Sequence, residues 1–251
     1  MSDWLDTHDQ EIVASALSHA QQAGAAQADA VLIRSDSREA RVRGEEIEFV
    51  KQAAERCLGL RAMVQHADGL STAVTSTCDI SPEAIAQIAS DTVALAGATA
   101  SDPHAGLPGG DYAEELPTLD TLDPGDLNVT IEARIDDARR AETAAREFDS
   151  RIDNSEGSQA DSDFSQIVYG NSQGFLASYE SAYHSLFSAP LASEGESKQT
   201  DYWVTVGRRL SDLEDPASVG RRAAERTVGR LGARQIATCE APVLFDAFTA
   251  P

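Results

Sequence analysis

A strict alternation of side chains between residues 175 and 191 is the feature that most constrains the fold of this chain. All the aromatic residues of the segment occupy odd positions: Phe175, Tyr179, Tyr183 and Phe187. Glu180 and His184 occupy even positions. A period of two places these sets on opposite faces of a strand, whereas a helix would scatter them around its axis. The segment therefore predicts a long β-strand with one aromatic face.

Helical and strand-like patterns follow one another in both halves of the chain. Ile12 to Ala20 has helical spacing, and helix starts are marked by Ser81-Pro82 and Asp215-Pro216, each a capping residue followed by proline. Period-two alternation recurs at 46–49 and 58–64. The connections between strands are short, which favours antiparallel pairing because parallel strands need a long crossover. The predicted fold class is α+β, with two halves that each combine helices and an antiparallel meander.

A segment rich in proline, glycine and acidic residues separates the two halves. We expect an N-terminal α+β domain at 1–100, an acidic linker loop at 101–126, and a central α+β region with long antiparallel strands at 127–251. A helix from about Leu127 to Phe148 opens the central region. Ala241 to Phe245 predicts a strand that begins close to the last residue. We therefore expect a C-terminal domain that is truncated at its start.

The net charge limits the partners of the chain. There are 42 acidic and 20 basic residues, which gives a formal charge of −22. Such a surface repels phosphate, so it disfavours nucleic acid and anionic membranes as partners. No apolar run is long enough to span a membrane. The three cysteines, Cys57, Cys78 and Cys239, are scattered and lack a C-x-x-C pair, which predicts reduced thiols in a cytoplasmic protein.

The sequence carries no motif that is specific for metal or serine chemistry. None of the five histidines lies within five residues of another, so a paired-histidine helix is absent. Gly170 to Gly174 matches G-x-S-x-G, but the segment that follows is the aromatic strand rather than a helix. Ser172 is therefore predicted to lie in a strand-to-strand turn, and His184 to be a structural residue. We expect no catalytic, metal-binding or cofactor-binding residue on this chain.

A positive stripe marks the last predicted helix. It consists of arginines at intervals of four: Arg222, Arg226, Arg230 and Arg234. The stripe could contact a partner through its charge, or it could be a solvated face whose arginines pair with Glu225, Asp212, Glu214 or other nearby acids. We favour the solvated face and keep partner contact as the alternative.

Several short motifs resemble one protein family when they are taken in order. They are Gly59 with Arg61, Ser76 to Asp79, Asp102-Pro103, Arg151 to Gly157, Tyr169 to Phe175, His184 to Leu186, Asp201-Tyr202, Ser211 to Leu213 and Ala241 to Phe245. Together they resemble the PmbA/TldE branch of the TldD/PmbA metalloprotease family, also called modulators of DNA gyrase. The resemblance covers nearly the whole chain, which is about half the usual length of the family.

The resemblance implies a subunit of a cytoplasmic zinc metalloprotease that acts on peptides. In this family a TldD-like subunit carries the metal motif, so zinc is expected on that partner and the present chain is expected to be non-catalytic within a heterodimer. No catalytic residue of the family maps onto this sequence. Two other functions remain open: an interaction module of the gyrase-modulator type that uses the Arg222–Arg234 stripe, and a serine hydrolase that uses Ser172.

Overall fold

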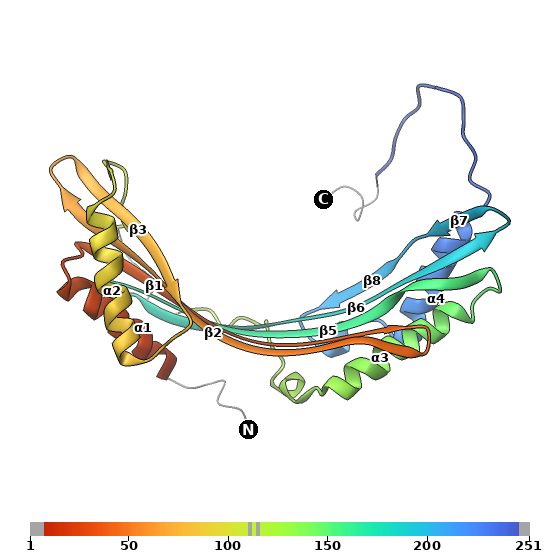
Figure 1. Cartoon of the computed structure of the whole chain (residues 1–251), viewed down its shortest axis with the longest axis horizontal. Coiled ribbons are helices and arrows are strands. Elements are labelled where there is room, and N and C mark those ends of the chain that lie inside the picture. The colour runs from red at the N-terminus through yellow and green to blue at the C-terminus, as the bar shows by residue number, and fades with distance from the viewer. Residues whose placement is uncertain (1–7, 110–111, 114–115, 246–251) are drawn as a thin grey trace.

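The computed structural model of the protein describes residues 8–109, 112–113 and 116–245. These residues form one curved, eight-stranded sheet with two pairs of helices at its opposite ends (Figure 1). The α-helices are α1 (His8–Gln22), α2 (Pro82–Gly97), α3 (Ile131–Arg146) and α4 (Pro216–Gly229). The strands are β1 (Gln27–Arg43), β2 (Glu46–His66), β3 (Gly69–Thr77), β4 (Ser101–Asp102), β5 (Ile152–Asn171), β6 (Leu176–Glu194), β7 (Ser197–Thr200) and β8 (Trp203–Gly207). Two 3-10 helices are η2 (Pro124–Asn128) and η3 (Leu210–Asp212).

All neighbouring strands of the sheet pair antiparallel, in the order β4-β3-β2-β1-β5-β6-β7, and β8 pairs with β6. The predicted α+β class and its antiparallel meanders are thus confirmed. The sequence did not indicate that β1 pairs with β5 from Asp29 to Val42. This pairing joins the meanders of the two halves into one sheet.

The strands are longer than the alternation predicted. Strand β2 contains both the 46–49 and the 58–64 patterns within 21 residues. Between them, side chains on both faces are exposed or half-buried. The 58–64 pattern coincides with a buried face, whereas the centre of β2 buries neither face and carried no signal in the sequence.

The four helices cover the same face of the sheet. Leu32 of β1 packs in one buried cluster with Val13 of α1 and Ile85 of α2. Val42, at the far end of the same strand, packs in a second cluster with Ala138 of α3 and Val219 of α4. Leu32 and Val42 are both even-numbered and β1 pairs with β5 without a bulge between them, so they lie on one face.

The predicted helix starts at Ser81 and Asp215 are confirmed. The Ser81 hydroxyl accepts a hydrogen bond from the Ala84 N–H, and the Asp215 carboxylate accepts one from the Ser218 N–H. The helix expected from Leu127 begins later, at Ile131, because Thr130 caps it and residues 124–128 form η2. Within the described residues, no helix combines the length and the apolar character needed to cross a bilayer.

The expected strand at Ala241 to Phe245 is wrong. These residues have no strand partner within the described part of the chain, and they are exposed, with Leu244 at 97%. An apolar run becomes a strand only when another strand satisfies its backbone hydrogen bonds. The predicted domain ranges also include residues 1–7, 110–111, 114–115 and 246–251, which lie outside the described residues.

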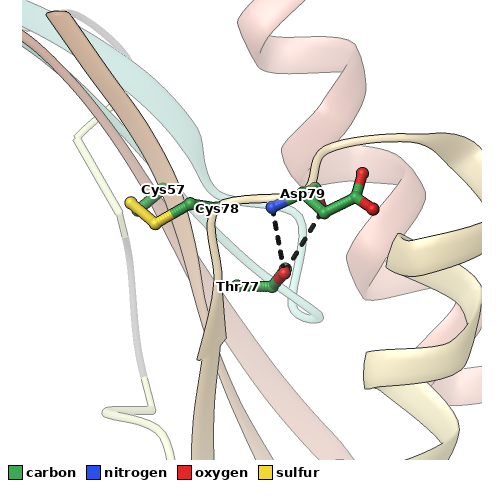
Figure 2. The surroundings of a disulfide bond; sticks show 4 residues. All are labelled: Cys57, Thr77, Cys78 and Asp79. Atoms are coloured by element: carbon green, nitrogen blue, oxygen red, sulfur yellow. Dashed lines mark hydrogen bonds between the residues drawn. A yellow bond between two sulfur atoms is a disulfide. The ribbon is translucent and has the colours of Figure 1, made fainter.

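The expectation of three reduced thiols is corrected by a disulfide between Cys57 and Cys78 (Figure 2). The β2–β3 register sets Leu58 opposite Thr77, so the next residues, Cys57 and Cys78, face each other with their Cα atoms 4.1 Å apart. Local spacing could not reveal this pair, because the two cysteines are 21 positions apart and meet only through hairpin register. Cys239 is free and exposed.

Candidate functional site: the open face of the sheet

The face of the sheet opposite the helices is called here the open face. Between the bulges of the sheet, it is formed by odd-numbered residues, within 29–41 of β1, 49–61 of β2, 159–169 of β5 and 177–187 of β6. The aromatic side chains predicted to share one face of β6 lie here, and Tyr179 and Tyr183 are 44% and 45% exposed. The alternation is therefore confirmed, and it marks a partly solvent-exposed surface rather than the core.

A hollow of about 290 Å³ lies on this face where β1, β2, β3 and β5 run side by side. Its lining is Asp29, Ala30, Val31, Gly59, Leu60, Arg61, Val74 and Tyr169. Gly59 keeps it open, since a Cβ there would lie 3.3 Å from the Val31 side chain. We call this space the Arg61 hollow.

A second hollow, of about 250 Å³, adjoins the first. It is lined by Leu116, Pro117, Leu119, Ile167, Tyr169, Phe175, Ala177, Ser178 and Tyr179. Its wall at 116–119 is held near the sheet by Thr121, whose carbonyl accepts a hydrogen bond from the Ala182 N–H at 2.7 Å. We call this space the Phe175 hollow. Tyr169 lines both hollows and therefore separates two apolar spaces.

A charged pair and a tyrosine form the polar side of the Arg61 hollow. Arg61 donates two hydrogen bonds to Asp29, from Nε at 2.8 Å and from Nη2 at 2.5 Å, and the Tyr169 hydroxyl donates a third at 3.0 Å. Burial and then the Asp29 carboxylate raise the pKa of Tyr169. The hydrogen bond to Asp29 raises the pKa of Arg61. All three side chains are therefore held in one orientation, and Tyr169 stays protonated.

Carboxylates gather further along the open face. Asp161 and Asp163 of β5 lie near Glu39 of β1, and Asp161 accepts a hydrogen bond from Ser185 at 2.9 Å. Burial raises the pKa of both aspartates, and for Asp163 the neighbouring charge of Asp161 adds to the shift. Lys51 pairs with Glu39 at 2.9 Å. The open face thus combines two apolar hollows with a nearby acidic region.

The described residues do not fit a zinc ion. Within 8–109, 112–113 and 116–245, no three His, Cys, Asp or Glu side chains gather in a way that could hold a metal. The Asp29 carboxylate is already occupied by Arg61 and Tyr169.

His184 lies on the helix-covered face and is fully buried. Its Nδ1 is 2.9 Å from the Ser162 hydroxyl, and its Nε2 is 3.5 Å from a carboxylate oxygen of Asp126. Burial lowers the pKa of His184, and the Asp126 carboxylate opposes this shift. These contacts agree with the prediction of a structural histidine.

Ser172 lies in the turn between β5 and β6, as predicted. Its hydroxyl accepts a hydrogen bond from the Ala28 N–H at 2.9 Å, and its own N–H donates to the Ala28 carbonyl at 2.8 Å. Ser172 thus fastens the turn to the start of β1. No contact between Ser172 and a histidine is found among the described residues, so the geometry gives the hydrolase hypothesis no support.

Three arginines of the predicted stripe are engaged with acids of this chain. The guanidinium carbon of Arg222 lies 3.8 Å from the centre of the Trp203 ring, and its Nη1 lies 3.6 Å from a carboxylate oxygen of Glu214. Arg226 and Arg230 both lie 3.4 Å from Asp201. Helix α4 ends at Gly229, so Arg230 is its C-cap residue and Arg234 lies beyond it. The proposed partner contact through these four residues stays a prediction.

Sequence reasoning missed the group formed by Asp29, Arg61 and Tyr169. The three residues come from three strands, and only the β1–β2 and β1–β5 registers bring them together. A partial signal existed, because the 58–64 alternation places Arg61 on the face opposite the buried leucines.

Comparison with known protein families identifies both halves of the chain. Residues 28–96 match the PmbA/TldA metallopeptidase domain 1, and residues 124–231 match the PmbA/TldA metallopeptidase central domain. Metalloprotease PmbA of Escherichia coli O157:H7 is 38% identical over 201 residues, which are 80% of this chain and 43% of that protein. The Metalloprotease PmbA homolog of Haemophilus influenzae is 31% identical over 245 residues, which are 96% of this chain and 53% of that protein.

Solved structures share the fold at lower sequence identity. A putative modulator of DNA gyrase from Bacteroides thetaiotaomicron has a TM-score of 0.81 and 21% sequence identity. The match covers 92% of the present chain and 52% of the Bacteroides chain. TldE from Thermococcus kodakarensis has a TM-score of 0.72 and 15% sequence identity, and the match covers 86% of the present chain and 47% of the TldE chain. The chain spans about half the length of the curated relatives it matches.

Proposed function

Because the chain belongs to the PmbA/TldD metallopeptidase family, we propose that it acts as a PmbA/TldE-type, non-catalytic subunit that binds peptides for a zinc-bearing, TldD-like partner. In this proposal the two subunits form a heterodimer in the cytoplasm. The partner supplies the metal and its chemistry, and the open face of the present chain holds the peptide.

The position of the two hollows is the observation that carries the proposal. Asp29, Gly59 and Arg61 belong to the segment matched by the first family domain, and Tyr169 belongs to the segment matched by the central domain. Ligand sites occur preferentially at such junctions. Two apolar spaces on either side of Tyr169 suit two side chains of one extended peptide, whose alternate residues project in the same direction.

The experiment is reconstitution with a TldD-like protein from the same genome. The chain is co-expressed with that protein, and light scattering, metal analysis and cleavage of a fluorogenic casein substrate are measured. We expect a one-to-one complex that cleaves the substrate and carries zinc on the TldD-like subunit, and no cleavage by the present chain alone. Stoichiometric zinc on the isolated chain, with chelator-sensitive cleavage, would overturn the proposed division of roles.

The peptide-binding role is tested separately by Tyr169→Ala in the complex. Loss of the ring merges the two hollows, so KM should rise while the heterodimer still forms. Tyr183→Ala is the control, because Tyr183 is another tyrosine of the open face, is more exposed than the half-buried Tyr169, and lines neither hollow. Equal KM values for the two variants would exclude the hollows as the peptide site.

The second candidate function is an interaction module of the gyrase-modulator type that uses the arginines of α4. Its support is the description of the Bacteroides thetaiotaomicron protein as a putative modulator of DNA gyrase. Against it, the positive charges of Arg222, Arg226 and Arg230 already face Glu214 and Asp201. A gyrase supercoiling assay with wild type and an Arg226→Ala/Arg230→Ala variant separates the two functions.

A further inference from the structure

We propose that a groove between α3 and α4 is a docking site for an acidic, partly apolar segment of a partner protein. The groove has a volume of about 550 Å³. It is lined by Arg139, Arg140, Thr143, Ala144, Glu147, Phe148, Ala217 and Arg221. It lies on the helix side of the sheet, so it is separate from the open face, and the proposal does not depend on the peptide-binding role.

The two helices that form the groove are held together closely. Gly220 of α4 packs directly on α3, where a Cβ at this position would overlap the Ala141 carbonyl. An ion pair of 2.6 Å between Arg140 and Asp215 links the helices at the groove itself. The groove is therefore a preformed surface and does not need to be assembled when a partner binds.

The charge of the groove is opposite to that of the molecule. Arg139 and Arg221 are exposed, and neither forms an ion pair with a carboxylate among the described residues. In the described part of the chain, the Arg221 side chain donates one hydrogen bond, to the neutral Ser218 hydroxyl at 3.1 Å. Arg140 is compensated by Asp137 and Asp215, so Arg139 and Arg221 against Glu147 leave an excess of positive charge in the lining, in a chain whose formal charge is −22.

The remaining lining indicates which kind of anion the groove suits. Ala144, Ala217 and the ring of Phe148, which is 44% exposed, provide an apolar floor between the arginines. A nucleic acid would bring many phosphates close to the acidic remainder of the chain, which repels them. A short protein segment with acidic and apolar side chains matches both the floor and the charge without that cost.

Fluorescence polarisation with a defined probe tests the site. The probe is a fluorescein-labelled peptide composed of glutamate, with leucine at every third or fourth position. We expect the wild-type chain to bind it at low salt, and the Arg139→Glu/Arg221→Glu variant to bind about tenfold or more weakly. Binding should also fall at about 0.5 M salt, where charges are screened within a few ångströms.

Two further variants make the result specific. Lys198→Glu/Arg234→Glu changes the net charge by the same amount at exposed positions outside the groove, and should bind like wild type. Phe148→Ala should weaken binding through loss of the apolar contact. Circular dichroism confirms that each variant is folded.

Three outcomes would overturn the proposal. The first is equal peptide binding by the groove variant and the charge-matched control. The second is absence of binding by the wild-type chain at low salt. The third is a different occupant: a single-stranded oligothymidine that binds the groove more tightly than the peptide, or light scattering that shows a dimer of this chain lost in the Arg139→Glu/Arg221→Glu variant.

Discussion

The carboxylate of Asp29 on β1 accepts two hydrogen bonds from the guanidinium of Arg61 on β2, at 2.8 and 2.5 Å, in a bidentate contact. The two residues face each other in the β1–β2 register. The Asp29 side chain is only 10% exposed, whereas that of Arg61 is 39% exposed. The aspartate therefore depends on this arginine for compensation of its charge.

Replacing Arg61 should destabilise the protein. In Arg61→Ala the buried Asp29 carboxylate keeps only the hydrogen bond from Tyr169, so we expect a loss of about 2 kcal/mol in the free energy of unfolding. Urea denaturation measures this quantity. Arg43→Ala is the control, because Arg43 is half-exposed and its contacts are long, and it should change stability by about 0.5 kcal/mol or less. Equal effects of the two substitutions would contradict this account.

The close packing of α3 and α4 predicts opposite results for two glycines of one helix. In Gly220→Ala the new methyl group meets the Ala141 backbone, so the helices must separate, at a cost of about 2 kcal/mol or more. In Gly229→Ala nothing lies within 4 Å of the new Cβ, and the higher helix propensity of alanine should leave stability equal or slightly raised. Thermal unfolding of both variants is the measurement, and a harmless Gly220→Ala would show that the helices are not in contact.

The Cys57–Cys78 disulfide predicts the number of reactive thiols. Alkylation of the native protein followed by mass spectrometry should modify Cys239 alone, and reduction should expose the other two. Removing this cross-link between residues 21 positions apart should lower stability by about 3 kcal/mol. Three reactive thiols in native protein purified without reductant would contradict the pairing and agree with the proposed cytoplasmic location, since disulfides are rare in that compartment.

His184 predicts a pH dependence of stability in the mildly acidic range. Its pKa in the folded protein lies below the ordinary value of 6.5 because it is buried, so the unfolded chain binds the proton more readily. Stability should therefore fall as the pH drops below about 6.5 and should be fully present above that value. Asp126 and Asp212 oppose the shift, and Arg134 adds to it.

The comparison that isolates this effect is wild type against His184→Gln, with urea unfolding measured from neutral to mildly acidic pH. As the pH falls, the unfolding free energy of wild type should decrease relative to that of His184→Gln. Buried aspartates such as Asp161 have raised pKa values and titrate in both proteins, so they cancel in the difference. A difference that is constant with pH would exclude His184 as the titrating group.

Much of the fold could be predicted because the relevant signals are local. The cap and proline at Ser81-Pro82 and Asp215-Pro216 mark helix starts that the structure confirms. The alternation from 175 to 191 predicts β6 and its aromatic face. The strand expected at 241–245 is wrong because strand formation also needs a pairing partner, which a local pattern does not show. These apolar residues have no strand to pair with in the described chain.

The candidate sites were less accessible to sequence reasoning. The arginine stripe was found on the correct helix, but its members Arg222, Arg226 and Arg230 face acids of this chain. The positive groove instead joins Arg221 with Arg139 of α3, across two helices. A periodic pattern within one helix cannot reveal a charge that is left uncompensated between two.

The sequence by itself determined the α+β class, the types of most helices and strands, and the residues that share a face wherever a period of two or of 3.6 is visible. These properties depend on the spacing of neighbouring side chains, which the order of residues contains directly. Only the tertiary structure decided that β1 pairs with β5, that Cys57 meets Cys78, and that Tyr169 reaches Asp29. Each of these depends on strand register between distant segments, where a shift of one residue would turn every side chain to the other face.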